Sequence, residues 1–191
     1  ISGDLLVVID KEDHPDLIGI GGLCIDYKFI KDAMSIIRAT DPHVPIVLGG
    51  GIVTNDAEYI YNLLKPDYAI VGEAEGGIVD IASGSLALYR RENNPSIISS
   101  YCQLPIDKLP FPDYEPFGIQ EMLDNYSMST RLLYRYSRPY ARPFSIVASR
   151  GCPFSCTFCI HRNGHHERKY RARSIESIMA EIKVTYEKYH Y

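Results

Sequence analysis

The stretch Ile46-Val47-Leu48-Gly49-Gly50 is a short apolar run that ends in glycine. Two similar runs lie at residues 17–21 (Leu-Ile-Gly-Ile-Gly) and 68–72 (Tyr-Ala-Ile-Val-Gly). Short apolar runs bounded by turn residues are typical of strands buried on both faces of a parallel sheet. These three runs therefore predict three parallel strands.

Helical patterns separate the expected strands. Residues 27–40 show an apolar repeat of four, with Asp26 in the capping position, and residues 55–64 show a similar repeat, with Asn55 as the expected cap. A further helix is expected at Gly3–Glu12. Alternating strands and helices predict an α/β domain with a parallel sheet and right-handed crossovers.

Glycines follow each expected strand, at residues 21–22, 49–51 and 72. Ligands of open α/β sheets bind outside the carboxyl ends of the strands, where glycine lets the backbone approach a large ligand. The pattern is compatible with a cofactor crevice, and equally with glycines that only turn the chain. No G-x-G-x-x-G follows a strand, which disfavours a nicotinamide or flavin dinucleotide.

Composition places the chain among globular proteins. Of its 191 residues, 46% are hydrophobic and 23% are charged. No apolar run approaches the roughly 18 residues that a membrane-spanning helix needs, so no membrane span is expected. The chain begins at Ile1 without a basic-then-apolar leader, which predicts no secretory signal and an incomplete N-terminus.

The charge is unevenly distributed. Up to Thr130 the balance is −12, and from Arg131 onward it is +8. This uneven charge has two alternative explanations. The two parts present surfaces that are solvated differently, or the basic part faces an anionic substrate or cofactor. Four prolines between Leu104 and Phe117 predict an extended connection. The arginines and tyrosines of residues 131–142 are interrupted by prolines, and no nucleic-acid partner is expected.

Three of the five cysteines, Cys152, Cys156 and Cys159, follow an expected strand at residues 144–148. The odd number of cysteines favours a reducing cytoplasm over a disulfide framework. Cys24 and Cys102 are interpreted as small buried apolar residues. Three thiolates in C-x3-C-x2-C spacing suit an iron–sulfur cluster, and without a fourth cysteine nearby a cubane would keep one iron open.

This loop resembles the radical S-adenosylmethionine (SAM) superfamily, which shares the spacing and an aromatic residue, here Phe158, before the last cysteine. The resemblance implies that Cys152, Cys156 and Cys159 hold a [4Fe–4S] cluster. In such enzymes the open iron chelates SAM, and an electron from the cluster cleaves SAM to methionine and a 5'-deoxyadenosyl radical. Phe158 is implied to pack near the adenine of SAM. His161, His165 and His166 are interpreted as bystanders.

The segment after the loop predicts a helix over residues 175–189, with Ser174 as its cap. Its expected buried face is apolar and consists of Ile175, Ile178, Met179, Ile182 and Tyr186. The resemblance implies that this helix opens a truncated radical SAM (β/α) barrel, since a whole barrel needs on the order of 200 residues. Most of that catalytic domain is expected to lie beyond Tyr191.

The upstream part resembles the radical SAM subclass with an N-terminal cobalamin (B12)-binding domain. Pro15–Gly21, Leu48–Gly50, Val71–Glu75 and Leu109–Tyr114 carry this likeness. It implies a Rossmann-like (flavodoxin-like) domain at 1–103, a Pro-rich, arginine- and tyrosine-rich connection at 104–143 and the start of the radical SAM core at 144–191. The implied cobalamin contacts are Gly21, Gly22, Leu23, Gly49, Gly50, Gly51, Gly72 and Glu73. The D-x-H-x-x-G element is absent, so cobalt would lack a histidine ligand.

The expected function is that of a cytoplasmic radical SAM enzyme, with methyl transfer to an unreactive carbon as its chemistry. Cyclisation and methylthiotransfer remain alternatives, although a methylthiotransferase needs three further N-terminal cysteines and only Cys24 and Cys102 are present. A non-catalytic metal-binding module is the alternative from another class, although C-x3-C-x2-C is unusual for zinc. The resemblance implies a small-molecule or lipid-like substrate and a flavodoxin or ferredoxin as reductant.

Overall fold

The computed structural model describes residues 15–85, 94–100, 105–125, 141–154, 156–157, 159 and 170–191. The chain divides into two compact units, one of Ile1–Gln103 with Ser155–His166 and one of Leu104–Phe154 with Glu167–Tyr191. Several positions discussed above lie outside the described residues: the expected helix at Gly3–Glu12, the residues Cys102 and Phe158, and the histidines His161, His165 and His166. No helix in the described ranges is long and apolar enough to cross a membrane.

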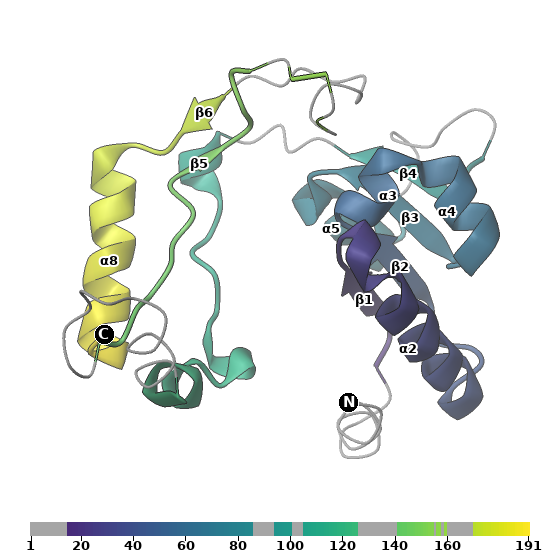
Figure 1. Cartoon of the computed structure of the whole chain (residues 1–191), viewed down its shortest axis with the longest axis horizontal. Helices are drawn as coiled ribbons and strands as arrows, with labels where there is room; N and C mark the ends of the chain where they lie inside the picture. The colour runs from purple at the N-terminus through teal and green to yellow at the C-terminus, as the bar shows by residue number, and fades with distance from the viewer. Residues whose placement is uncertain are drawn as a thin grey trace. The chain divides into compact units, whose positions relative to one another are not determined.

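The first unit contains a four-stranded parallel sheet in the order β1-β2-β3-β4 (Figure 1). The strands are β1 (Ile18–Gly21), β2 (Ile46–Gly49), β3 (Tyr68–Gly72) and β4 (Ile97–Ser100). The three expected strands and their parallel pairing are confirmed. Strand β4 was not predicted, because Ile97 and Ile98 are its only apolar residues.

Helices cover both faces of this sheet. The helices α2 (Tyr27–Thr40), α3 (Gly51–Asn55) and α4 (Ala57–Leu64) pack on one face, and α5 (Ala74–Ser83) packs on the other. Helix α5 lies close to β4, since a Cβ atom on Gly77 would lie 3.0 Å from the Cβ atom of Ser100. This arrangement is compatible with a Rossmann-like domain.

Two expected helix caps were wrong. The side chain of Asp26 does not cap α2, and its Oδ2 instead accepts a hydrogen bond of 2.8 Å from the backbone N–H of Leu23. The second wrong cap is Asn55, which ends α3 and does not cap the expected helix at residues 55–64. The cap of α4 is Asp56, which separates α3 from α4 and accepts a hydrogen bond of 3.2 Å from the N–H of Tyr59. The aspartate caps α4 because its backbone is non-helical at that point.

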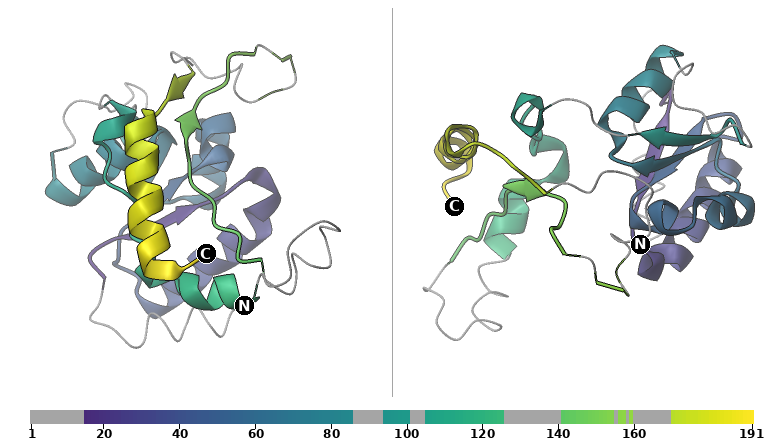
Figure 2. Two further views of the ribbon diagram at one scale, coloured as in Figure 1. Left: turned by 90° about the vertical axis from the view of Figure 1, so that its left-hand side faces the viewer. Right: turned by 90° about the horizontal axis from the view of Figure 1, so that it is seen from above.

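The second unit combines the Pro-rich segment with the last helix. Its described residues include the 3-10 turns η3 (Ile106–Lys108) and η4 (Glu115–Phe117), a helical stretch at 119–125, and α8 (Ile175–Tyr189). Strands β5 (Ser149–Arg150) and β6 (Arg171–Ala172) form an antiparallel pair, and β6 leads into α8 (Figure 2). The core of this unit contains Ile119, Leu123 and Tyr189.

The expected strand at residues 144–148 was wrong. Residues 141–148 have no regular structure, and the strand β5 begins at Ser149. The carbonyl groups of Val147 and Ala148 instead accept hydrogen bonds from Arg173, through its side chain at 3.1 Å and its backbone N–H at 2.9 Å.

The limits of α8 and its cap are confirmed, since the Oγ of Ser174 accepts a hydrogen bond of 3.1 Å from the N–H of Ser177. Its expected apolar face was wrong. The buried residues are Glu181, Thr185 and Tyr189, whereas Ile175 is 74% exposed and Met179 is 55% exposed. A polar side can be buried here because its polar groups are hydrogen-bonded.

Candidate functional site

The glycines that were expected to contact a cofactor meet at one edge of the sheet. Because all four strands are parallel, the segments that follow β1, β2 and β3 emerge at their common carboxyl edge. Register pairs Gly21 with Gly49 and Gly72 with Ser100. Glu73 lies at the N-terminus of α5, where its N–H donates a hydrogen bond of 3.1 Å to the carbonyl of Ser100.

Some of these glycines are needed for packing between loops. Gly50 has a φ of +83°, and a Cβ atom on it would lie 2.8 Å from both the backbone N and the O of Gly22. The N–H of Ile52 donates a hydrogen bond of 3.0 Å to the carbonyl of Gly22. A Cβ atom on Gly51 would lie 2.8 Å from the side chain of Leu23. The loops after β1 and β2 therefore pack directly against each other.

Two other glycines at the carboxyl edge, Gly21 and Gly49, have almost no atoms packed against them. A Cβ atom on Gly21 would meet no atom within 4 Å, and one on Gly49 would meet only the carbonyl O of Ile70, at 4.0 Å. No packing contact explains glycine at these two positions. Their backbone is accessible to a ligand that lies against the edge of the sheet.

Thr54 links the loops and was missed by the sequence interpretation. Its Oγ1 donates a hydrogen bond of 3.0 Å to the carbonyl of Gly50 and accepts one of 3.3 Å from the N–H of Gly72. One hydroxyl group thus joins the ends of β2 and β3. A lone threonine in a helix carries no sequence signal for such a role.

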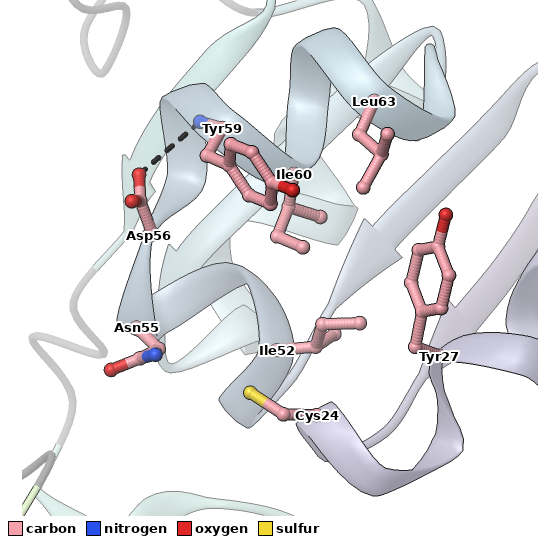
Figure 3. A pocket seen from close by; sticks show the side chains of 8 residues that line it. All are labelled: Cys24, Tyr27, Ile52, Asn55, Asp56, Tyr59, Ile60 and Leu63. Atoms are coloured by element: carbon pink, nitrogen blue, oxygen red, sulfur yellow. Dashed lines mark hydrogen bonds between the residues drawn. The ribbon is translucent and has the colours of Figure 1, made fainter.

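A pocket of about 440 Å³ lies on the face of the sheet that α2, α3 and α4 cover. It is formed between the start of α2 and helices α3 and α4 (Figure 3). Its lining combines apolar, aromatic and polar side chains: Cys24, Tyr27, Ile52, Asn55, Asp56, Tyr59, Ile60 and Leu63. The interpretation of Cys24 as a buried residue was wrong. Its thiol is free and exposed because the 3-10 turn η1 (Cys24–Asp26) lies at the surface.

The three cysteines of the proposed cluster loop are free thiols. Cys152 and Cys159 are half-buried and Cys156 is exposed. The N–H of Cys159 donates a hydrogen bond of 3.1 Å to the carbonyl of Cys156, so the last two cysteines belong to one tight turn. Cysteine thiolates are the ligands that iron–sulfur clusters take, so the chemistry of these three donors fits such a cluster. The structure does not bring the three thiols together as a metal centre, because no group of three or more His, Cys, Asp or Glu residues in the described ranges is placed to hold a metal ion.

The segments that flank this loop carry a charged network in the second unit. The hydroxyl of Tyr114 donates a hydrogen bond of 2.9 Å to Glu181, and Arg173 forms an ion pair with the same carboxylate. Burial, and then this hydrogen bond, raise the pKa of Tyr114 to about 12. At the surface, the hydrogen bond from Lys188 lowers the pKa of Glu115.

The sequence is similar to that of a curated protein. No family model matches the chain. It is 26% identical, over 201 aligned residues, to a protein of Pyrococcus horikoshii that is named as an uncharacterized methyltransferase. The chain is similar to a methyltransferase. The alignment covers 97% of this chain and 40% of the relative, so the chain spans two fifths of that protein's length.

Among solved structures, the fold is similar to that of TsrM, a radical SAM methyltransferase from Kitasatospora setae, solved with tryptophan and a SAM analogue bound. The TM-score is 0.58 at 14% sequence identity. The match covers 98% of this chain and 37% of the TsrM chain. This likeness concerns the fold.

Proposed function

We propose that the chain is part of a radical SAM methyltransferase, in which Cys152, Cys156 and Cys159 hold a [4Fe–4S] cluster. The observation that carries the proposal is the set of three free thiols in C-x3-C-x2-C spacing. The similarity to a methyltransferase along nearly the whole chain supports it. The fold shared with TsrM agrees with it.

The residues of the loop have separate roles in this proposal. The three thiolates bind iron, and Phe158 packs against the adenine of SAM. When bound, the cluster supplies the electron that cleaves SAM reductively. Since the ligands come from one short loop, its two ends must be held in place for the thiolates to converge.

We further propose that residues 1–103 bind cobalamin at the carboxyl edge of the sheet, without a histidine ligand to cobalt. The bare backbone at Gly21 and Gly49 supports this, because a large flat ligand needs close approach. Residues 104–143 are proposed as the connection and 144–191 as the start of the catalytic barrel. The proposed setting is cytoplasmic, with a flavodoxin- or ferredoxin-type reductant and a small-molecule or lipid-like substrate.

Anaerobic reconstitution of the full-length protein with iron and sulfide tests the cluster. We expect about four irons per chain and reductive cleavage of SAM to 5'-deoxyadenosine. Alanine substitutions of Cys152, Cys156 or Cys159 should each abolish both. The Cys24→Ala variant is the matched control, because its thiol is free but lies outside the loop, and it should retain both.

The non-catalytic metal module predicts a different result. Purified protein with one tightly bound zinc, no iron after reconstitution and no SAM cleavage would contradict the proposed function. Loss of iron from the Cys24→Ala variant would also contradict the assignment of ligands.

A further inference from the structure

Arg173 and Glu181 form a buried ion pair in the second unit. The side chain of Arg173 is 9% exposed and that of Glu181 is 1% exposed. Removing both charges from water is costly, and a buried pair often stabilises a fold no more than apolar residues of the same volume would. What such a pair supplies is a fixed geometry, because its hydrogen bonds have defined directions.

The guanidinium of Arg173 bonds to two other segments of the chain. Its Nη1 donates to Glu181 and also to the carbonyl of Val147, at 3.1 Å. Its Nε and Nη2 donate to the Oγ of Ser177, at 3.2 and 3.0 Å. The group also lies over the ring of Phe111, 5.5 Å from its centre. A lysine in this position could not make the same forked set of bonds.

Glu181 extends the network to the Pro-rich segment. One carboxylate oxygen bonds Arg173 and the other accepts the 2.9 Å hydrogen bond from Tyr114. Both oxygens of this buried carboxylate are therefore used. The network joins three parts of the second unit: the Pro-rich segment, the irregular segment that precedes β5, and helix α8.

The segments directly before and after the cysteine loop lie beside this network. Strand β5 ends two residues before Cys152, with Gly151 at a φ of +84° between them, and the loop returns through β6 immediately before Arg173. The backbone N–H of Arg173 also donates a hydrogen bond of 2.9 Å to the carbonyl of Ala148. Arg173 thus holds the segment that directly precedes β5 through both its side chain and its backbone.

We propose that Arg173, held by Glu181, is a positioning residue for the cysteine loop: it fixes the β5–β6 pair so that Cys152 is presented to the cluster in one orientation. This inference rests on the proposed function. Groups that orient metal ligands commonly change metal affinity by about 10- to 100-fold when they are replaced. The Arg173–Glu181 pair acts on the ligand segment through the backbone of Val147 and Ala148.

The first test compares iron loss from full-length reconstituted proteins to an excess of a ferrous chelator. Arg173→Lys and Glu181→Gln should release iron at least about tenfold faster than the wild type. They should also change the electron paramagnetic resonance signal of the reduced cluster and its response to SAM. The matched control is Arg38→Lys, because Arg38 similarly pairs with Asp67 and donates a hydrogen bond of 2.6 Å to the carbonyl of Val44, but in the other unit.

A second test needs no cluster. In the metal-free protein, alkylation of the half-buried Cys152, followed by mass spectrometry, should be several-fold faster in Arg173→Lys than in the wild type, with Cys24 unchanged as the internal reference. Tyr114→Phe is a milder variant, because it removes one hydroxyl from the network, and should show a smaller change in the same direction.

The outcomes separate the two proposals. If the wild type takes up iron and Arg173→Lys matches Arg38→Lys in iron loss, signal and Cys152 alkylation, the positioning role is contradicted and the proposed function stands. If the wild type takes up no iron, the proposed function and the inference both fall. If Arg173→Lys does not fold, Tyr114→Phe decides, and wild-type iron loss in that variant counts against the role.

Discussion

Gly50 lies against the backbone of Gly22, so closely that a Cβ atom on Gly50 would be 2.8 Å from the nitrogen and the oxygen of Gly22. Gly50 also has a φ of +83°, which strains residues with side chains. Gly50→Ala should therefore lower the free energy of unfolding by about 2 kcal/mol or more. Urea unfolding followed by circular dichroism measures this loss.

Gly84→Ala is a reference for positive φ without a collision. Gly84 has a φ of +72° and a ψ of 10°, in the left-handed region that other residues can adopt, whereas the ψ of Gly50 is −168°, and a Cβ atom on Gly84 would meet nothing within 4 Å. Gly84→Ala should lower the free energy of unfolding by about 1 kcal/mol, which is the cost of placing alanine at a positive φ. Equal losses in the two variants would show that the contact between the loops contributes nothing.

Gly21→Ala should behave differently. A Cβ atom there meets no protein atom within 4 Å, so the free energy of unfolding should change by no more than about 0.5 kcal/mol. If cobalamin lies on the bare edge, the added methyl group occupies the space of the cofactor, and retention of hydroxocobalamin during gel filtration should fall. Retention equal to the wild type would place the cofactor elsewhere.

Three of the four strands were predictable because each carries its own local signal. The runs at residues 17–21, 46–50 and 68–72 are apolar and end in glycine, and the helix at 27–40 has one apolar face. Such signals depend on neighbours in the sequence. Strand β4 has only two apolar residues, and α5 contains Gly76 and Gly77, so neither gave a comparable pattern.

The arrangement around α8 was not predictable, because it depends on contacts between residues that are far apart in the sequence. Its buried side is fixed by partners far away in the sequence, since Tyr114 lies 67 residues from Glu181. A periodicity rule assigns the buried side to apolar residues, whereas here a satisfied ion pair occupies it. The glycines showed a similar limit, because the sequence could not separate Gly50, which packs, from Gly21, which does not.

Ser174→Ala tests the cap of α8. The mutation removes the acceptor of the 3.1 Å hydrogen bond from the N–H of Ser177, which should cost about 1 kcal/mol of unfolding free energy. Ser35→Ala is the control, because Ser35 is exposed in the interior of α2 and its hydroxyl donates a hydrogen bond of 2.9 Å to the carbonyl of Lys31 in its own helix. It should cost nothing, since alanine is the better helix former. A loss in Ser35→Ala as large as in Ser174→Ala would contradict a capping role.

The pH dependence of stability tests the environment of Tyr114. Its pKa of about 12 in the folded chain exceeds the usual value of 10, so the folded chain keeps the phenol proton at a pH where the unfolded chain loses it. The stabilisation is complete below about pH 10 and declines as the pH rises from 10 to 12. In urea unfolding, wild type should therefore be more stable than Tyr114→Phe by a margin that is constant below pH 10 and shrinks above it. A margin that does not change with pH across this window would show that burial and the hydrogen bond to Glu181 do not raise the pKa of Tyr114.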